Sequence, residues 1–262
     1  MTIKFIGTGS GIISEKRFHS SILLETEKSN LLIDVGDGIS KALLFQKIPF
    51  CNIQNILITH SHPDHLSGIA SLIMQMKLQE RLNPLNIFIP TELLQSLNTL
   101  LKIHYLFPEN LKFKLNLVGC DFNIKNKLEN NFYFIFMKNS HITEEKIINH
   151  IYKNIGFVSA SVFIHCEDMN IAYTSDIGKV EDLYLFDDLR CNLFISESTH
   201  ISNEEIYRAF IKSGSEKLIL THIENEMEIY DWYQKLTELQ RNSIIIAEDG
   251  MSLDLKELFA SG

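Results

Sequence analysis

The chain has 262 residues, of which 45% are hydrophobic and 22% are charged, proportions that are ordinary for a soluble globular protein. Its formal net charge of −9 at pH 7 argues against tight, nonspecific binding of long nucleic acids, which depends on lysine and arginine contacts to phosphates. No apolar run approaches the roughly 20 residues that a membrane span requires. The N-terminus, Met1–Gly7, has the pattern of a first strand and lacks the regions of a secretion signal.

The spacing of the cysteines and the lack of linkers limit the classes of protein to which the chain can belong. Four cysteines stand at positions 51, 120, 166 and 191 without a C-x-x-C spacing, so we expect neither a disulfide framework nor a thiolate zinc site. A reducing cytoplasm is the simplest location for such a chain. No internal repeat, low-complexity tract or long Pro/Gly/Ser linker interrupts the sequence, which predicts one domain over residues 1–262.

The first half of the chain alternates strand-like and helix-like stretches. The hydrophobic pattern predicts strands at 3–6, 21–25, 31–35, 55–59 and 87–89, and helices from 39 to about 46, from 66 to 79 and from 91 to about 103. A glycine-rich turn, residues 7–11, follows the first strand.

The second half continues in the same style. Strand-like runs at 111–117 and 131–137 precede a hairpin of 156–165 and 170–174, which turns at 166–169. Short strands at 193–195, 217–220 and 243–246 alternate with helical stretches near 203–213 and 226–239. Together these elements predict an α+β fold, a four-layer αββα sandwich of two mixed β-sheets flanked by helices.

The most informative stretch is His60-Ser61-His62-Pro63-Asp64-His65, which lies between the strand at 55–59 and the following helix. His60 and His62 are two residues apart in extended chain, so their rings point to the same side. Asp64 and His65 fall in the first helical turn after Pro63, a residue suited to a helix start. Imidazole nitrogens and carboxylate oxygens are ligands for zinc and similar ions. A histidine-rich polar loop is the alternative, but the density of donors favours a metal site.

Three further donors follow later strands. His141 comes after the run at 131–137, Asp176 after the strand at 170–174, and His222 after Lys217–Leu220. Without the motif order, His141 would be an ordinary surface histidine and Asp176 a turn residue. Asp34 ends the strand at 31–35 and is expected either to hydrogen-bond a ligand side chain or to form the turn.

The order H-x-H-x-D-H, a distant histidine, an aspartate after a strand and a final histidine resembles the metallo-β-lactamase superfamily of dinuclear metal hydrolases. Within it, the chain is most similar to the ribonuclease Z branch. The similar stretches are Phe5–Gly9, Ile33–Gly38, Ile219–Ile223 and Glu248–Met251.

The resemblance implies two divalent metal ions, with zinc expected and manganese as the other candidate. It assigns one ion to His60, His62 and His141, the other to Asp64, His65 and His222, with Asp176 as the bridge. Two ions about 3.5–4 Å apart lower the pKa of a shared water, and the bridging hydroxide attacks phosphorus or a carbonyl carbon. Asp64 could orient that hydroxide as well as bind metal.

The branch also carries a glutamate after a strand and a histidine twenty-two residues before the last metal ligand, which Glu197 and His200 match. His200 is expected to contact a substrate phosphate or to protonate the leaving oxygen, oriented by Glu197. The alternative is that His200 caps the helix that begins near Ser202.

The chain departs from ribonuclease Z in ways that argue against tRNA as its substrate. The long arm that grips the tRNA body has no counterpart between Gly68 and His141, and the loop from Glu197 to His200 is short. We therefore expect a phosphodiesterase for a small or nucleotide-like substrate. Hydrolysis of a lactone, thioester or other carboxyl ester on the same site is the second hypothesis, and a non-catalytic member of the fold is the third. No membrane partner is expected, and the likeness to ribonuclease Z allows for a homodimer.

Overall fold

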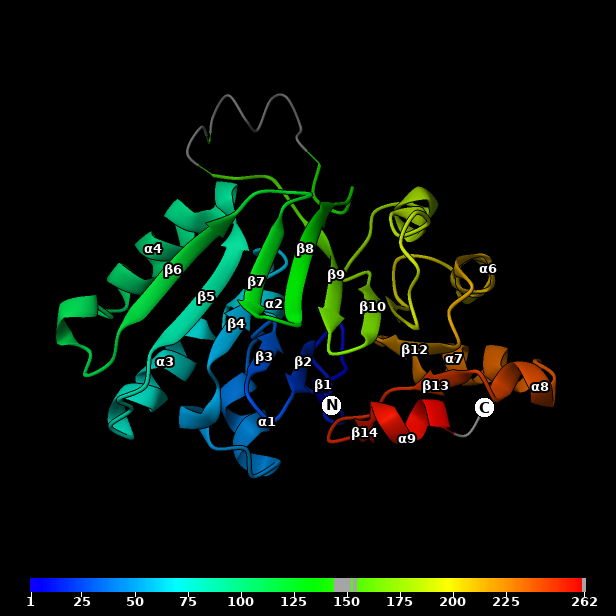
Figure 1. Ribbon diagram of the computed structural model, residues 1–262, viewed down its shortest axis with the longest axis horizontal. Coiled ribbons are helices and arrows are strands. Elements are labelled where there is room, and N and C mark those ends of the chain that lie inside the picture. Colours follow the sequence, from blue (N-terminus) through cyan, green and yellow to red (C-terminus); the bar gives the residue numbers. More distant parts are fainter. Residues whose placement is uncertain (144–151, 153–154, 261–262) are drawn as a thin grey trace.

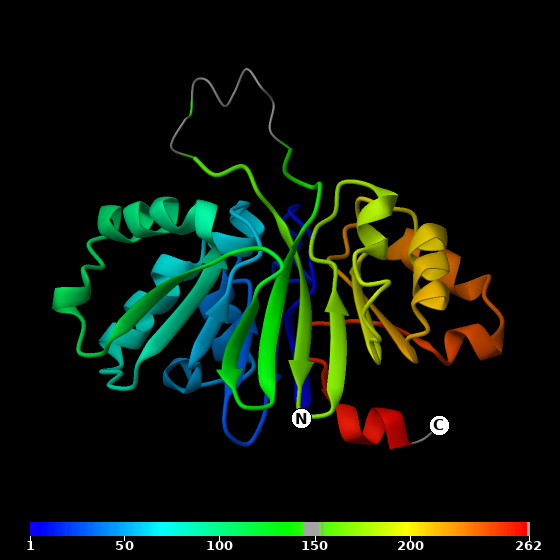
Figure 2. The ribbon, with the colours of Figure 1, turned by 45° about the horizontal axis from the view of Figure 1, so that its top comes forward.

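The structure is a computed structural model that describes residues 1–143, 152 and 155–260 (Figure 1). Its strands form two seven-stranded sheets in these ranges, one from each half of the chain apart from a single C-terminal strand. The view in Figure 2 shows the strands in the middle, with helices of the first half on one side and helices of the second half on the other. The predicted αββα sandwich is therefore confirmed. None of the helices in the described ranges is long and apolar enough to cross a membrane.

The first sheet has the strand order β14-β1-β2-β3-β4-β5-β6. Its strands are β1 (Thr2–Gly7), β2 (Ser21–Glu25), β3 (Asn30–Ile33), β4 (Asn55–Leu57), β5 (Leu85–Pro90), β6 (Leu115–Cys120) and β14 (Ser252–Asp254). Strands β14 to β3 pair antiparallel, whereas β3 to β6 pair parallel. The carboxyl ends of β3 and β4 consequently meet at the same end of the sheet.

The second sheet has the strand order β13-β12-β11-β10-β9-β8-β7. Its strands are β7 (Lys125–Glu129), β8 (Phe132–Lys138), β9 (Ala160–Cys166), β10 (Met169–Tyr173), β11 (Leu193–Glu197), β12 (Lys217–Thr221) and β13 (Ile244–Ile246). Strands β7 to β10 pair antiparallel and β10 to β13 pair parallel. The parallel part again brings several carboxyl ends together, here those of β10, β11 and β12.

Helices cover the outer face of each sheet because strands such as β8 carry apolar side chains on both faces. In β8, Phe132, Phe134 and Phe136 belong to the core between the sheets, while Tyr133 and Ile135 pack outward. The first sheet is covered by α1 (Ile39–Phe45), α3 (Ile69–Leu78) and α4 (Leu94–Ile103), and the second by α6 (Asn203–Ser213), α7 (Glu226–Gln234) and the 3₁₀ helix η4 (Val180–Tyr184). The remaining helices are α2 (Pro63–Leu66), α8 (Glu238–Arg241), α9 (Leu255–Ala260), η1 (Phe50–Asn52), η2 (Thr91–Leu93) and η3 (Pro108–Asn110).

Several predicted boundaries were wrong. The helix expected at 66–79 is broken, and only α3 continues past Gly68. A Cβ atom on Gly68 would lie 2.3 Å from the carbonyl oxygen of Gly36, so the chain passes too close to the 34–36 turn for a larger residue. The strand expected at 111–117 is β6, which begins at Leu115, and the helix expected at 226–239 ends at Gln234 before α8 starts. Strands β7 and β14 and helix α9 were not predicted.

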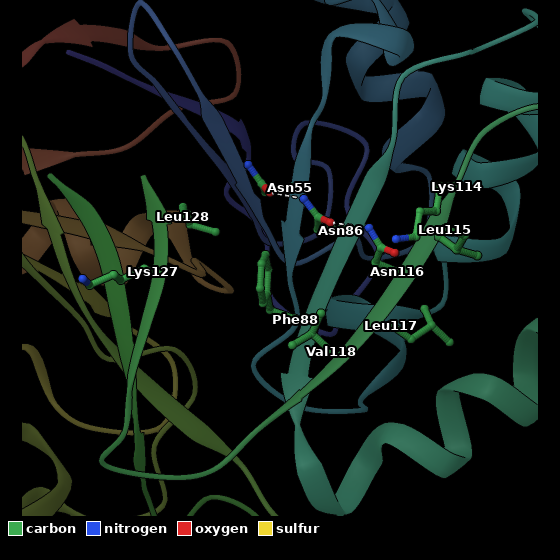
Figure 3. A pocket seen from close by; sticks show the side chains of 10 residues that line it. All are labelled: Asn55, Asn86, Phe88, Lys114, Leu115, Asn116, Leu117, Val118, Lys127 and Leu128. Carbon is green, nitrogen blue, oxygen red and sulfur yellow. Dashed lines mark hydrogen bonds between the residues drawn. The ribbon is translucent and has the colours of Figure 1, made fainter. Parts of the chain in front are cut away.

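The last strands of the two sheets, β6 and β7, border a cavity of about 670 Å³ (Figure 3). Asn55, Asn86 and Asn116 stand in register on neighbouring strands of its wall. The amide of Asn116 donates to Asn86 over 2.8 Å, and that of Asn86 donates to Asn55 over 2.9 Å. These side-chain hydrogen bonds link β4, β5 and β6, which gives the three asparagines a structural role.

Candidate metal centre and active site

The His60–His65 motif lies between a strand and a helix, as the sequence predicted. Strand β4 ends at Leu57, and α2 begins at Pro63 with His62 at its N-cap position. Helix α2 packs directly against the turn after β3. The contact is so close that a Cβ atom on Gly36 would lie 2.0 Å from the carbonyl oxygen of Asp64. Glycine at position 36 therefore allows the motif to approach the neighbouring strand end, where Asp34 stands.

One group of donors consists of His60, His62, His141 and Asp176, whose ligand atoms lie within 4.8 Å of one another. The Nε2 atom of His141 lies 3.1 Å from Nδ1 of His62 and 3.6 Å from Oδ2 of Asp176. The Nε2 atom of His60 lies 3.9 Å from the same carboxylate oxygen. Three imidazoles and one carboxylate oxygen thus surround a single point.

The other group consists of Asp64, His65, Asp176 and His222, again within 4.8 Å of one another. The Nε2 atom of His222 lies 3.2 Å from Oδ2 of Asp64 and 3.3 Å from Oδ1 of Asp176. The Nε2 atom of His65 lies 3.2 Å from that Oδ1 atom. The two oxygens of Asp176 therefore face different donor groups, which is the arrangement a bridging carboxylate needs. We call the seven side chains of both groups the donor cluster.

Asp34 and Thr59 orient two of the imidazoles. The Nδ1 atom of His65 lies 2.8 Å from Oδ2 of Asp34, to which it donates a hydrogen bond, so Nε2 is the ring nitrogen that faces the cluster. The backbone N–H of Thr59 donates to Asp34 over 2.8 Å, and its hydroxyl lies 3.0 Å from Nδ1 of His60. Ser175 donates to the same hydroxyl over 2.9 Å. Thr59 and Ser175 were not predicted, because single hydroxyl residues carry no sequence signal for this role.

Three residues at the strand ends have left-handed backbone conformations. Asp34 has φ 59°, Ser175 has φ 51° and His222 has φ 53°. Such conformations are costly for residues other than glycine and persist where the surrounding structure holds them, often at functional sites. They turn the chain sharply after β3, β10 and β12, so that Asp34, Asp176 and His222 reach the cluster. Asp34 thus fulfils both alternatives considered for it, as a turn residue and as a partner of His65.

The buried atoms of the donor cluster fit a pair of divalent ions. Nε2 of His60, Nε2 of His65 and Oδ1 of Asp176 are buried and have no hydrogen-bond partner in the part of the chain that the structure describes. Buried polar atoms are normally paired. Ring nitrogens and a carboxylate oxygen that converge on one place without hydrogen bonds therefore indicate a binding site for cations. Nitrogen and oxygen donors of these types suit zinc and manganese alike.

The electrostatics of the cluster show how strongly its groups interact. Burial lowers the pKa of His60 well below its ordinary value and lowers that of His141 to about 4. For His65, burial acts in the same direction, but the carboxylates of Asp176 and Asp34 outweigh it and raise the pKa well above the ordinary value. Burial opposes ionisation of Asp176 as well, yet the neighbouring imidazoles His222 and His65 hold its pKa well below the usual range. The carboxylates of Asp176 and Asp34 thus make the site favourable for cations.

Glu197 and His200 lie beside the donor cluster. Glu197, the last residue of β11, is fully buried, and its Oε2 atom accepts hydrogen bonds from the backbone N–H groups of Thr199 (2.7 Å) and His200 (2.9 Å). Its Oε1 atom lies 3.2 Å from Nδ1 of His200, and this contact raises the pKa of His200 although burial opposes it. The His200 ring lies 4.7 Å from the ring of His141 and 5.8 Å from that of His222.

The helix-cap alternative for His200 disagrees with the observed cap. Helix α6 has Ser202 at its N-cap position, and the Ser202 hydroxyl accepts a hydrogen bond from the backbone N–H of Glu205. The His200 ring instead points its Nδ1 atom to Glu197 and leaves its Nε2 atom away from that carboxylate. The structure therefore brings all nine predicted site residues into one region, seven in the donor cluster and two beside it.

Comparisons with known proteins agree with this geometry. A ribonuclease Z from Methanococcus aeolicus is 26% identical to the chain over 325 aligned positions, covering 98% of each sequence. The crystal structure of human tRNase Z, short form, superimposes with a TM-score of 0.72 at 19% identity and covers 97% of this chain and 99% of that one. The metallo-β-lactamase fold protein YhfI from Bacillus subtilis also gives a TM-score of 0.72, at 17% identity, covering 96% and 98%.

The chain thus has the fold of the metallo-β-lactamase fold proteins, and both its sequence and its fold are similar to those of ribonuclease Z enzymes. The family model described as Anti-Pycsar protein Apyc1 matches residues 1–243. The chain belongs to this family.

Proposed function

We propose that the protein is a dinuclear metal-dependent phosphodiesterase that hydrolyses a small or nucleotide-like phosphodiester. The observation that carries the proposal is the arrangement of the donor cluster, in which the two oxygens of Asp176 face separate sets of imidazoles and His200 stands at the border. The sequence likeness to a ribonuclease Z along nearly the whole chain supports the same reaction type.

The proposed ligands are those of the two donor groups. His60, His62 and His141 would hold one ion, and Asp64, His65 and His222 the other, with Asp176 between them. Ions bound there supply an activated water and stabilise the charge on the oxygens of an in-line displacement. We favour zinc, with manganese as the alternative, because the set is rich in imidazole.

The residues around the ligands position these groups and handle the proton. Asp34 keeps the Nε2 lone pair of His65 directed at the cluster through the bond to Nδ1. Glu197 holds the His200 ring through Nδ1, which leaves Nε2 to contact a phosphate oxygen or to protonate the leaving oxygen. The raised pKa of His200 favours the protonated form that this role needs. Asp64 would also orient the attacking water.

The decisive assay compares ester classes on the metal-loaded protein. We expect hydrolysis of bis(p-nitrophenyl) phosphate and of cyclic or linear nucleotide phosphodiesters, with little activity on precursor tRNA. Activity confined to lactones, thioesters or other carboxyl esters would replace the phosphodiesterase proposal by the second hypothesis. Metal analysis tests the third, because a non-catalytic protein that retained less than one ion per chain in zinc-containing buffer would contradict the proposal.

We also propose a cytoplasmic location and leave the homodimer as a prediction. The four cysteines are free, and three of them are buried, which suits a reducing compartment. Small-angle scattering or analytical ultracentrifugation of the purified chain would test the dimer directly.

A further inference from the structure

His141 and Asp176 stand on two loops of the second sheet whose strands are not direct neighbours. The loops follow β8 and β10, and β9 lies between these strands (Figure 1). Because β8 and β10 both pair antiparallel with β9, they run in the same direction and finish at the same end of the sheet. The position of His141 relative to Asp176 therefore depends on contacts that cross the start of β9.

Asn139, which directly follows β8, makes these contacts. Its side chain is buried, and its Oδ1 atom accepts a hydrogen bond from the backbone N–H of His141 over 3.2 Å. Its Nδ2 atom donates to the backbone carbonyl of Asp176 over 2.9 Å and to the Ser161 hydroxyl, in β9, over 3.0 Å. That hydroxyl donates in turn to the carbonyl of Thr174 over 2.7 Å. One amide thus joins the loops of both ligands to the strand between them.

Asn139 also acts on the loop of His141 through Ser159, which is fully buried. The Ser159 hydroxyl donates a hydrogen bond to Oδ1 of Asn139 and accepts one from the backbone N–H of Ile142 over 3.0 Å. The N–H of His141 is therefore held by Asn139 directly, and the N–H of Ile142 through Ser159. Loss of the Asn139 amide would disturb two successive N–H groups of this loop.

Asp182 joins the same two loops independently of Asn139. Its Oδ2 atom accepts hydrogen bonds from the backbone N–H and the hydroxyl of Ser140, over 3.1 and 2.6 Å, and from the N–H of Gly178 over 3.0 Å. The loops approach so closely that a Cβ atom on Gly178 would lie 2.2 Å from the carbonyl oxygen of Ser140. Because Asp182 keeps the loops together, loss of Asn139 should have a local effect at His141.

The two donor groups differ in exposure. The His141 group consists of His60, His62, His141 and Asp176, and the His222 group of Asp64, His65, Asp176 and His222. All side chains of the His222 group are buried, whereas His62 is exposed and His141 is half-buried. In the described part of the chain, the hydrogen bonds that place His141 from outside the donor cluster involve its backbone, whereas Asp34 bonds the His65 ring itself. The His141 group therefore depends more on how its backbone is held.

From these contacts we propose that Asn139 is a positioning residue that sets the affinity of the His141 group for its metal ion, because it holds the loop of His141 against that of Asp176. The His222 group keeps its affinity without Asn139, since Asp182 continues to hold the loop of Asp176. This inference rests on the two-ion centre of the proposed function and is independent of the substrate.

Zinc affinity tests the inference without any turnover. Competition with a chromophoric chelator gives the affinities of both ions in the unaltered protein and in Asn139→Ala, below the Tm of each. We expect one ion to bind at least about 10-fold more weakly in the variant and the other to stay within about 2-fold, as for the loss of a group that orients one ligand. Equal affinities in the two proteins would overturn the inference.

Asn55→Ala is the matched control. Asn55 and Asn139 are both 5% exposed, and each amide both accepts and donates hydrogen bonds. Asn55 lies at the start of β4, whereas the His60–His65 motif follows the end of that strand. We expect Asn55→Ala to lower the Tm and to leave both zinc affinities unchanged. The same loss of one ion in Asn55→Ala would overturn the inference, because general destabilisation would then account for it.

Ser159→Ala provides a milder variant in case Asn139→Ala does not fold. It removes only the hydroxyl between Asn139 and the N–H of Ile142. We expect it to weaken the same ion by about 3-fold, the order of one hydrogen bond. An unchanged affinity in a folded Ser159→Ala protein would contradict the inference.

Cobalt absorption identifies which ion is weakened. His141→Ala and His222→Ala each remove a ligand of one group, so their difference spectra assign the visible bands of bound cobalt to the two groups. We expect Asn139→Ala to weaken the bands that His141→Ala removes. Weakening of the bands that His222→Ala removes, or of both sets to the same extent, would overturn the inference.

The metal content of the unaltered protein separates this inference from the proposed function. Two bound ions, with equal zinc affinities in Asn139→Ala, would refute the inference and leave the proposed centre in place. Fewer than two ions would refute the proposed centre and the inference with it. Selective loss of one ion in Asn139→Ala, together with no phosphodiester hydrolysis, would support the inference and refute the phosphodiesterase.

Discussion

The donor cluster and the cavity of about 350 Å³ that is lined by His200, Asn203, Glu224 and Glu228 are built from opposite kinds of groups. In the donor cluster, neighbours such as Asp34 and Thr59 hold Nδ1 of His65 and His60, so that both Nε2 atoms face a common centre. In the cavity, the carboxylates of Glu224 and Glu228 are exposed to solvent. The difference teaches that the donor cluster is organised by buried hydrogen bonds, whereas the cavity beside it is bordered by solvated carboxylates.

The largest effect is expected from Asp176→Ala, which removes the carboxylate shared by both donor groups. Loss of both ions should reduce phosphodiesterase activity by at least about 10⁴-fold, because metal-assisted activation of water supplies much of the acceleration. Metal content by mass spectrometry and kcat/KM on bis(p-nitrophenyl) phosphate measure the two losses. Asp168→Ala, in the exposed turn between β9 and β10, is the control, and an Asp176→Ala protein that kept both ions would contradict the assignment.

His200→Ala should retain both ions and slow turnover by roughly 10²–10⁴-fold if the imidazole acts as a general acid. Because the pKa of His200 is raised, mainly by its hydrogen bond to Glu197, its acid form persists to a higher pH than that of an ordinary histidine and is lost as the pH rises through that pKa. The unaltered protein should therefore lose activity on the alkaline side, and the variant should lack that decline. The exposed His104 supplies the matched His→Ala control. Equal rates and equal pH profiles would rule out this role.

Asp34→Asn is expected to weaken metal binding by roughly 10–100-fold, the usual effect of removing a hydrogen-bond partner of a ligand histidine. Asparagine tolerates the left-handed conformation at φ 59°, so the substitution tests the charge and the bond to His65 more than the backbone. Competition with a chromophoric zinc chelator measures the affinity. Wild-type affinity in the variant would show that the orientation of His65 does not depend on this carboxylate.

The smallest effect is expected from Ser202→Ala. Loss of the α6 cap should lower the free energy of unfolding by about 1 kcal/mol, which corresponds to a decrease in Tm of about 2–4 °C for a domain of this order of size. Differential scanning calorimetry checks it. His200→Ala should not cause the same decrease, because His200 does not cap the helix. A larger loss of stability in His200→Ala than in Ser202→Ala would revive the cap alternative.

The contiguous and the separated residues of the donor cluster differ in how far the sequence predicts them. The histidines and aspartate of 60–65 are contiguous, so their chemistry and their place between a strand and a helix can be inferred directly. His141, Asp176 and His222 follow three different strands, and in the sequence only their order along the chain, compared with a known family, connects them. Thr59 and Ser175 could not be found in this way, since their hydrogen bonds beside His60 depend on contacts that only the fold creates.

The errors in the predicted elements have similar physical causes. The break at Gly68 depends on contact with Gly36, which no local pattern contains. Strand β7 has the sequence Lys-Asn-Lys-Leu-Glu, whose alternate residues are exposed, so its apolar signal is weak. The two-sheet architecture was predictable because strand-like runs alternate with helical stretches in both halves of the chain and hairpins stand at the start of each half.

Strand β7 also bears on how the chain avoids self-association. It is the last strand of its sheet, and no strand of the described residues pairs with its outer row of backbone hydrogen-bonding groups. Lys125, Lys127 and Glu129 are exposed along it. Another molecule that added a strand there would have to strip water from these ions, which discourages fibre formation through open sheet edges. The charged residues that weaken the apolar pattern of β7 in the sequence thus also help to keep concentrated protein in solution.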